Sequence, residues 1–483
     1  MRVYVCFKLL GMLLMIFSLS MLTPLIVDGI YHEHVYLAFV VAFLITAVTG
    51  FILWMPFRNY HYELRTRDGF FVVTFLWFVL SMFGAIPLWL NHYTHIGFTD
   101  AAFESVSGIT TTGATVLTHL SDLPKSILYY RQQLHFLGGM GIIVLAVAIM
   151  PILGIGGMQL YRAEVVGPVK TSKFRPRIAQ TAKSLWYIYV GLTAACALSY
   201  WACGLDFFDA LGESFATVAT GGFSLHETSF AFYKSTAVDV VAIIFMILGS
   251  CNFALHFYFL SSRKISTYWK DYELIVFLRI ILLATVAISL YMVVGYHYSI
   301  VENPFHVLFT VVSLASTTGF TTVDFNQWPT FVPVLLMIIA MVGGCGGSTS
   351  GGIKVIRYLM VKEQGLREIR QLIHPNAVLS LNDGGGSKLP DKVLRSIWGF
   401  FSVYMFLFCF LILLLLATGM NLKTAFGALV VCIANTGASI GDVAQGFSHL
   451  HASEKWLLIF AMFLGRLEIF TVLVLFSPSY WRR

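Results

Sequence analysis

Charged side chains are scarce in this sequence. Asp, Glu, Lys and Arg make up 11% of the 483 residues, whereas 58% are hydrophobic and 15% are aromatic. A chain of this composition cannot bury its apolar surface in a soluble core. The shortage of charge therefore excludes a soluble protein and indicates an all-α integral membrane protein.

The sequence also lacks the usual motifs of soluble enzymes and nucleic-acid-binding proteins. Its seven cysteines have no metal-ligand spacing, its 14 histidines form no HExxH pattern, and it has no GxGxxG dinucleotide motif. The glycine-rich stretch GGCGGSTSGGIK differs from a phosphate loop because Ile353 separates Gly352 from Lys354. No soluble face carries basic residues interleaved with aromatics. We therefore expect no enzymatic activity, no organic cofactor and no nucleic acid partner.

Ten hydrophobic runs are long enough to cross a bilayer, which takes about 20 helical residues. They lie near residues 9–30, 36–57, 69–90, 133–155, 185–204, 237–260, 273–295, 331–346, 396–418 and 456–476. The first run resembles a signal peptide, but no small-residue cleavage site follows it before the next run. We therefore predict that it is retained as a membrane span.

Basic residues are concentrated in alternate connections between these runs. Residues 162–183, 263–270 and 354–395 hold most of the Lys and Arg, while the connections on the other side hold few. By the positive-inside rule, these three segments are cytoplasmic. We therefore predict a multi-pass protein of the bacterial inner (plasma) membrane, whose cytoplasmic surface contacts anionic membrane lipid or an acidic partner.

A fourfold internal repeat organises the chain. FTDAAFESVSGITTTGAT, from Phe98, aligns without a gap with FFDALGESFATVATGGFS, from Phe207, and FTVVSLASTTGFTT and FGALVVCIANTGAS are two weaker copies. Each copy lies between two hydrophobic runs, on a connection with few basic residues. A unit with two spans returns the chain to its starting side, so all four loops enter the membrane from the outer face. Irregular backbone at membrane depth must line a water-filled cavity or be buried in protein. We therefore interpret the four loops around one axis as an ion pathway.

Each copy reads as a short half-helix followed by hydroxyl or amide residues and then glycine. Glycine adopts backbone angles that are closed to other residues, so successive carbonyl groups can turn inward and replace the hydration shell of a cation. The negative end of each half-helix dipole also favours a cation. The candidate metal-binding residues are Thr111, Thr112, Gly113, Thr220, Gly221, Gly222, Thr317, Thr318, Gly319, Asn435, Thr436 and Gly437.

Two alternatives stay open at this point. The four loops could be re-entrant segments whose glycines only permit close helix packing, although their repetition in one column argues against this interpretation. Glu104 and Glu213 lie a helical turn or two before the loop tips. They either brace the half-helices against loop amides or coordinate the ion directly.

Six stretches of the chain resemble the Trk/Ktr/HKT superfamily of potassium transporters. They are SGITTTGAT, TGGFS, STTGFTT, GGCGGSTSGGIKVIR, LGRLEIF and the WRR near the C-terminus. Within that superfamily, essentially the whole chain is similar to the membrane subunit of bacterial Trk systems (TrkH type). The resemblance implies four pseudo-symmetric helix-pore loop-helix units around one ion pore, preceded by two extra N-terminal transmembrane helices.

The resemblance also assigns an ion to the pore. In the family, the glycine that follows each half-helix contributes to the single potassium site of the filter. Relatives with serine in place of this glycine in the first loop tend to admit sodium. This sequence has glycine in all four places. We therefore expect potassium to be both the transported and the filter-bound species.

On this scheme the two extra helices occupy residues 1–66. The four units occupy residues 67–160, 161–262, 263–382 and 383–483. The stretch DGGGSKLPDK, from Asp383, has the composition of a flexible connector between units three and four.

The glycine-rich stretch that begins at Gly343 breaks the hydrophobic run of the third unit. In the family that the chain resembles, this break forms an intramembrane loop that obstructs the pore below the filter and moves when the protein opens. Glycines and small hydroxyl side chains suit an unwound segment that lines water, and the alternative is a kink that only packs. The candidate gating residues are Gly343, Gly344, Gly346, Gly347, Ser348, Thr349, Ser350, Gly351, Gly352 and Arg466.

Arg466 is included because it interrupts a hydrophobic run. An arginine there costs at least about 3 kcal/mol on insertion scales, so it needs compensation. The resemblance implies that it faces the pore near the loop. The alternative is a structural pairing with Glu468 or with loop carbonyls, although residues two apart on a helix point to different faces.

Two functions and two partners remain as expectations. The first function is potassium-selective uptake, and the alternative is a potassium symporter coupled to sodium or protons on the same scaffold, since coupling need not leave a motif. The resemblance implies a homodimer that works with a cytosolic nucleotide-binding regulatory subunit (TrkA type).

Overall fold

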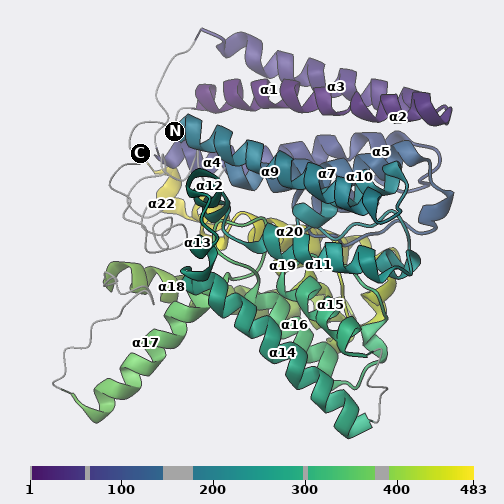
Figure 1. The fold of residues 1–483 in the computed structure, drawn as a ribbon. Coiled ribbons are helices and arrows are strands. Elements are labelled where there is room, and N and C mark those ends of the chain that lie inside the picture. Colours follow the sequence, from purple (N-terminus) through teal and green to yellow (C-terminus); the bar gives the residue numbers. More distant parts are fainter. Residues whose placement is uncertain (1–2, 60–65, 145–177, 297–302, 376–390, 483) are drawn as a thin grey trace.

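The computed structural model describes residues 3–59, 66–144, 178–296, 303–375 and 391–482 (Figure 1). Every regular element in these ranges is helical. The described ends of the chain lie on the same side of the molecule. The predicted boundaries at 160/161 and 382/383 lie outside the described residues, as do the connector up to residue 390 and most of the basic segment 162–183.

Two N-terminal helices, one of them interrupted, lie along one edge of the bundle (Figure 1). They are α1 (Val3–Ser20), which continues into α2 (Thr23–Tyr31), and α3 (Tyr36–Trp54). Gly11 and Gly50 bring α1 and α3 together, because a methyl group on Gly50 would lie 2.8 Å from the carbonyl oxygen of Gly11. Small residues permit this close backbone approach between membrane helices.

Four units follow, each with a first helix, a half-helix and a second helix. The first helices are α4 (Thr66–Gly84), α9 (Ile178–Ala202), α14 (Tyr272–Tyr296) and α18 (Asp391–Ala417). The half-helices are α6 (Phe98–Ile109), α10 (Phe207–Val218), α15 (Asn303–Ala315) and α19 (Leu422–Ala434). The second helices are α7 (Lys125–Val144), α11 (Thr236–Ser250), α16 (Phe331–Val342) and α20 (Ala452–Arg466). The fold is therefore the expected one of four pseudo-symmetric membrane units.

The half-helices are too short to cross a bilayer. The longest has 13 residues, whereas a span needs about 20. Their outer ends are stabilised locally: Asp100 and Asp209 occupy the first turns of α6 and α10, where a carboxylate complements the helix dipole. The side chain of Asn421 caps α19 by accepting a hydrogen bond from the Thr424 amide at 2.8 Å. Each half-helix therefore ends inside the protein.

Two of the predicted continuous spans are sharply bent. The described residues contain six helices that are long and apolar enough to span a membrane, or eight if each bent pair forms one span. The helix α11 continues into α12 (Phe253–Ser262) after a 97° bend, and α20 continues into α21 (Ile469–Phe476) after a 115° bend. Asn252 supports the first bend by capping α12. Each of the runs predicted over 237–260 and 456–476 therefore consists of two helices joined at a bend.

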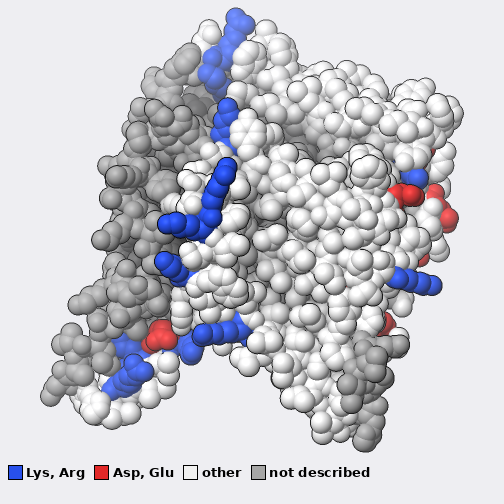
Figure 2. Space-filling view, viewed as in Figure 1, with Lys and Arg blue, Asp and Glu red and all other residues white. Residues whose placement is uncertain are grey.

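Charge divides the molecule into two sides. Figure 2 shows a band of Lys and Arg on the left part of this face, acidic residues mainly at the right edge, and between them a broad belt without Lys, Arg, Asp or Glu. The basic band lies on the side that holds both described ends of the chain. This arrangement agrees with the orientation that the positive-inside rule predicts.

Candidate functional site

The four half-helices end in the same backbone conformation. Just after each half-helix, one residue has a positive φ, and the glycine two positions later has a positive φ as well. The pairs are Thr111 (50°) and Gly113 (82°), Thr220 (51°) and Gly222 (85°), Thr317 (57°) and Gly319 (89°), and Asn435 (54°) and Gly437 (81°). Residues other than glycine rarely adopt a positive φ. The four copies identified in the sequence therefore share one unusual local structure.

The four loops close into a ring through their backbones. A methyl group added to each of these four glycines would meet a carbonyl oxygen of the next unit. In every case this carbonyl belongs to the residue directly before the corresponding glycine of that unit. The contacts run from Gly113 to Gly221, from Gly222 to Thr318, from Gly319 to Thr436, and from Gly437 to Thr112. We call these four loop tips the glycine ring. The structure thus brings together all twelve candidate metal-binding residues.

The glycine ring has the chemistry of a cation site. Backbone carbonyl oxygens are neutral ligands that can replace the water around a monovalent cation, and four half-helices direct the negative ends of their dipoles toward the ring. The side chains of Thr111, Thr112, Thr317, Thr318 and Thr436 are fully buried. The polar groups of the ring therefore lie inside the protein rather than on its surface.

Glu104 and Glu213 make the bracing contacts that one of the two alternatives predicted. The Glu104 carboxylate accepts a hydrogen bond from the Val116 amide at 2.8 Å, and Glu213 accepts one from the Leu225 amide at 2.8 Å, in both cases 12 residues further along the chain. Glu104 also pairs with the buried Arg131 at 2.7 Å. Both carboxylates therefore tie a half-helix to the ascending part of its own loop.

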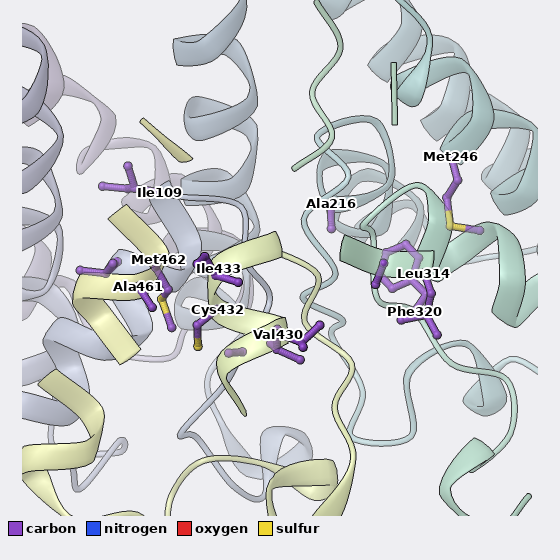
Figure 3. Close-up of a cluster of buried hydrophobic side chains, with 14 of the residues drawn as sticks. Ile109, Ala216, Met246, Leu314, Phe320, Val430, Cys432, Ile433, Ala461 and Met462 are labelled. Carbon is purple, nitrogen blue, oxygen red and sulfur yellow. The ribbon is translucent and has the colours of Figure 1, made fainter. Parts of the chain in front are cut away.

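The second helices of three units approach their half-helices at a glycine. A methyl group on Gly138, Gly249 or Gly465 would collide with a carbonyl oxygen near the end of the half-helix in the same unit, namely Ile109, Val218 or Ile433. Figure 3 shows the apolar packing around these ends, where Cys432 and Ile433 lie beside Ala461 and Met462. In the third unit, α16 ends at Val342 and the glycine-rich stretch begins.

The segment 343–354, which we call the unit-three loop, joins α16 to α17 (Val355–Ile373) and lies against the ends of three half-helices. Thr349 donates to the Val218 carbonyl at 2.9 Å and Ser350 to the Ser316 carbonyl at 2.8 Å. The Gly352 amide donates to the Ala434 carbonyl at 3.0 Å. Because the last carbonyls of a helix have no partner within that helix, the loop satisfies groups at the inner ends of units two, three and four.

The unit-three loop also contacts the glycine ring itself. The Gly351 amide donates to the Thr317 hydroxyl at 2.7 Å, and the Thr220 hydroxyl lies 3.2 Å from that of Thr349. Thr220 and Thr317 are the first positive-φ residues of their ring segments. The loop therefore lies directly beneath the ring.

Glycines let the unit-three loop fold tightly upon itself. Gly343, Gly347 and Gly352 have positive φ angles of 74°, 71° and 75°. A methyl group on Gly344 would lie 2.6 Å from the Ser350 hydroxyl oxygen, and Ser348 donates to the Cys345 carbonyl at 2.5 Å. A continuous helix cannot adopt these angles, which is why the hydrophobic run stops here.

Glu273 is a residue of this site that the sequence did not single out. Its buried carboxylate, in the first turn of α14, accepts hydrogen bonds from the Gly346 amide at 2.7 Å and the Ile356 amide at 3.1 Å. It therefore holds both limbs of the unit-three loop. The sequence signal that could have identified Glu273 is an acidic residue at the start of the hydrophobic run 273–295. Lys354, at the end of the loop, also donates to the Ser350 carbonyl.

Arg466 contacts the unit-three loop and not Glu468. Its Nη1 donates to the Thr349 carbonyl at 2.8 Å, and its side chain is buried. Glu468 pairs instead with Arg357 at 2.9 Å. The two residues do not pair, but the helical argument does not explain this, because α20 ends at Arg466 and Glu468 lies beyond its end. The contact observed is the pairing with a loop carbonyl that the structural alternative named, and it places the Arg466 guanidinium beside the loop.

Comparison with known proteins agrees with this geometry over the whole chain. The sequence model of the TrkH family, described as cation transport protein, matches residues 36–483. The Trk system potassium uptake protein TrkH of Halomonas elongata is 47% identical over 99% of this chain and 98% of its own length, and that of Escherichia coli K12 is 46% identical over 98% of each. The crystal structure of the potassium transporter TrkH from Vibrio parahaemolyticus superposes with a TM-score of 0.92 at 43% identity and covers 100% of both chains.

Proposed function

Because the chain belongs to the TrkH family of cation transport proteins, we propose that it takes up potassium ions through the glycine ring. It is a multi-pass protein of the bacterial inner membrane. Its relatives are named as transport proteins, and the proposed function is accordingly transport without catalysis. Potassium is the transported species in this proposal and is held in the ring during passage.

One observation carries this proposal: the ring is closed by the same backbone contact in all four units. Carbonyl oxygens fixed in this way can discriminate between ions by their spacing and number. Glycine at all four ring positions leaves no side chain beside these carbonyls. This feature supports selectivity for potassium over sodium.

We further propose that the unit-three loop is the gate. In its observed position it covers the inner side of the ring and donates hydrogen bonds to carbonyls at three half-helix ends. Each such hydrogen bond contributes only about 1 kcal/mol net, so a partner that binds the open form can displace the loop. Arg466 adds a positive charge beneath the ring that opposes cations while the loop stays in place.

The proposed partners act from the cytoplasmic side. We propose a homodimer that associates with a cytosolic nucleotide-binding regulatory subunit of the TrkA type. The name of the relatives, which places them in a Trk system, supports a regulatory partner. The basic side seen in Figure 2 offers positive charge to an acidic subunit or to anionic lipid.

The test is ion flux into liposomes that contain the purified protein. We expect the wild type to pass potassium and rubidium but little sodium, and Gly113→Ser to lower that preference by roughly tenfold, equivalent to about 1.4 kcal/mol. Serine at this position puts a Cβ atom against the Gly221 carbonyl. Gly191→Ser on α9, where a Cβ would meet no atom within 4 Å, is the matched control and should behave as the wild type.

Two results would decide against the proposal. If neither the wild type nor a variant with a shortened 343–352 segment passes a monovalent cation, the ring is not a pore. If potassium flux depends on a sodium or proton gradient, the protein is a coupled symporter on the same scaffold.

A further inference from the structure

Unit two departs from the other units at one position of the glycine ring. It has Gly221 where they have Thr112, Thr318 and Thr436. The backbone does not require glycine there, because the φ angle of Gly221 lies outside the left-handed region, and threonine occupies the equivalent place in three units. Something outside the loop must therefore exclude a side chain at residue 221.

The imidazole of His135 fills the space in question. A Cβ atom on Gly221 would lie 2.6 Å from Cγ and 2.7 Å from Cε1 of this ring. His135 comes from α7, the second helix of unit one, and is fully buried. Its ring also stacks on Phe223, with 4.2 Å between ring centroids and an 11° angle between ring planes. A residue of unit one thus supports the ring segment of unit two.

Neighbouring side chains on α7 hold the same segment. The Gln132 amide donates to the Phe223 carbonyl at 2.9 Å. The Arg131 guanidinium lies 4.3 Å from the centroid of the Phe223 ring and donates to the Ser224 carbonyl at 3.4 Å. One turn of α7 therefore fixes the backbone on the ascending side of Gly222.

Units one and three support the same position by a different contact. The hydroxyl of Thr112 lies 2.8 Å from that of Thr110, and the hydroxyl of Thr318 lies 2.7 Å from that of Ser316. In unit two the corresponding residues are Ala219 and Gly221, which carry no hydroxyl groups. The imidazole of His135 takes the place of this local pair.

We propose that His135 is a positioning residue for ion selectivity, which replaces the missing threonine side chain of the second ring segment. This inference rests on the proposed function of the ring. Removing the imidazole leaves a void beside Gly221, because protein interiors are close-packed. The Gly221 carbonyl is then free to shift toward a smaller ion, and discrimination against sodium falls.

The test combines His135→Ala, Gly221→Thr and the double variant, each reconstituted in liposomes. We expect His135→Ala to lower the potassium-to-sodium flux ratio by roughly fivefold, equivalent to about 1 kcal/mol. Gly221→Thr alone should lower the apparent melting temperature in detergent, because the new side chain overlaps the imidazole. The double variant restores the threonine pattern and should recover both the melting temperature and the flux ratio.

Gln133→Ala is the matched control, since Gln133 is buried on the same helix but donates to the Ser20 carbonyl on α1, away from the ring. It should leave the flux ratio unchanged. An unchanged ratio in His135→Ala, or a double variant no better than Gly221→Thr, would overturn the inference. If the proposed function itself is wrong, the wild-type protein will show no potassium flux. In that case the melting temperature of the double variant still reports whether His135 and residue 221 are in contact.

Discussion

The glycine ring and the unit-three loop lie in contact but are held together in different ways. The ring repeats one backbone conformation four times, and each glycine rests against a carbonyl of the next unit. The loop occurs once, and its own Thr349 and Ser350 donate to carbonyls of units two and three, while Glu273 on α14 accepts from a loop amide. Symmetry and repeated backbone contact characterise the first region, and individual hydrogen bonds of side chains and amides, none of them repeated by symmetry, characterise the second.

This difference separates two physical tasks. The glycines of the ring pack against carbonyls of neighbouring units, so the dimensions of the ring are set by the packing of the bundle, including side chains such as that of His135. A loop held by hydrogen bonds can leave when water or another group replaces those bonds, each of which contributes about 1 kcal/mol net. We therefore expect substitutions in the ring to change which ion passes, and substitutions in the loop to change how often any ion passes.

The largest effect on ion flux is expected in the ring. Gly319→Ala combines a φ of 89° with a Cβ atom placed against the Thr436 carbonyl. The left-handed conformation alone costs a residue with a Cβ atom about 1–2 kcal/mol. Including the steric overlap, we expect potassium flux to fall by roughly 100-fold.

The measurement is rubidium uptake into liposomes at matched protein density. Gly295→Ala on α14, where a Cβ would meet no atom within 4 Å, serves as the control. Uptake by Gly319→Ala at the wild-type rate, with the wild-type ion preference, would show that the ring is not closed as described.

At the carboxylates that brace the ring, the expected effect is on stability rather than on flux. Glu104→Ala leaves the fully buried Arg131 without its ion-pair partner, which typically destabilises a protein by about 3–5 kcal/mol. Glu213 accepts hydrogen bonds from the Ser224 hydroxyl and the Leu225 amide, which are uncharged donors. Glu213→Ala should therefore lower the free energy of unfolding by about 1–3 kcal/mol. Apparent melting temperatures in detergent should therefore fall further for Glu104→Ala. The reverse order would contradict this account of the two braces.

The smallest effect is expected in the unit-three loop. Ser350→Ala removes hydrogen bonds to the Ser316 carbonyl and the Ser250 hydroxyl. We expect potassium flux in the absence of any regulatory subunit to rise by roughly fivefold, for a loss of about 1 kcal/mol, while the potassium-to-sodium ratio stays unchanged.

Ser348→Ala is the control for this loop substitution, because among the described residues the Ser348 hydroxyl donates to the Cys345 carbonyl within the loop and not to a half-helix. Its basal flux should match that of the wild type. If Ser350→Ala altered the ion ratio and left the rate unchanged, the separation between ring and loop would fail.

Much of the fold could be predicted because its signals are local. Runs of about 20 apolar residues predict membrane helices directly, and four copies of one pattern predicted four half-helices of the same conformation, as Thr111, Thr220, Thr317 and Asn435 confirm with φ angles between 50° and 57°. The breaks after Ser250 and Arg466 were not predicted, because their flanking residues keep the composition of a straight span. The predicted unit boundaries and the assignments of filter and gate remain predictions.

The sequence by itself determined that the chain lies in a membrane, which side is basic and where the four glycines recur, because hydrophobic length, charge and repetition are properties of short segments. Only the tertiary structure decided that each glycine faces the carbonyl of the next unit, that Glu273 holds the loop from 73 and 83 residues away in the chain, and that His135 occupies the space beside Gly221. These are contacts between segments far apart in the sequence. They depend on how whole helices pack, and no local pattern encodes that packing.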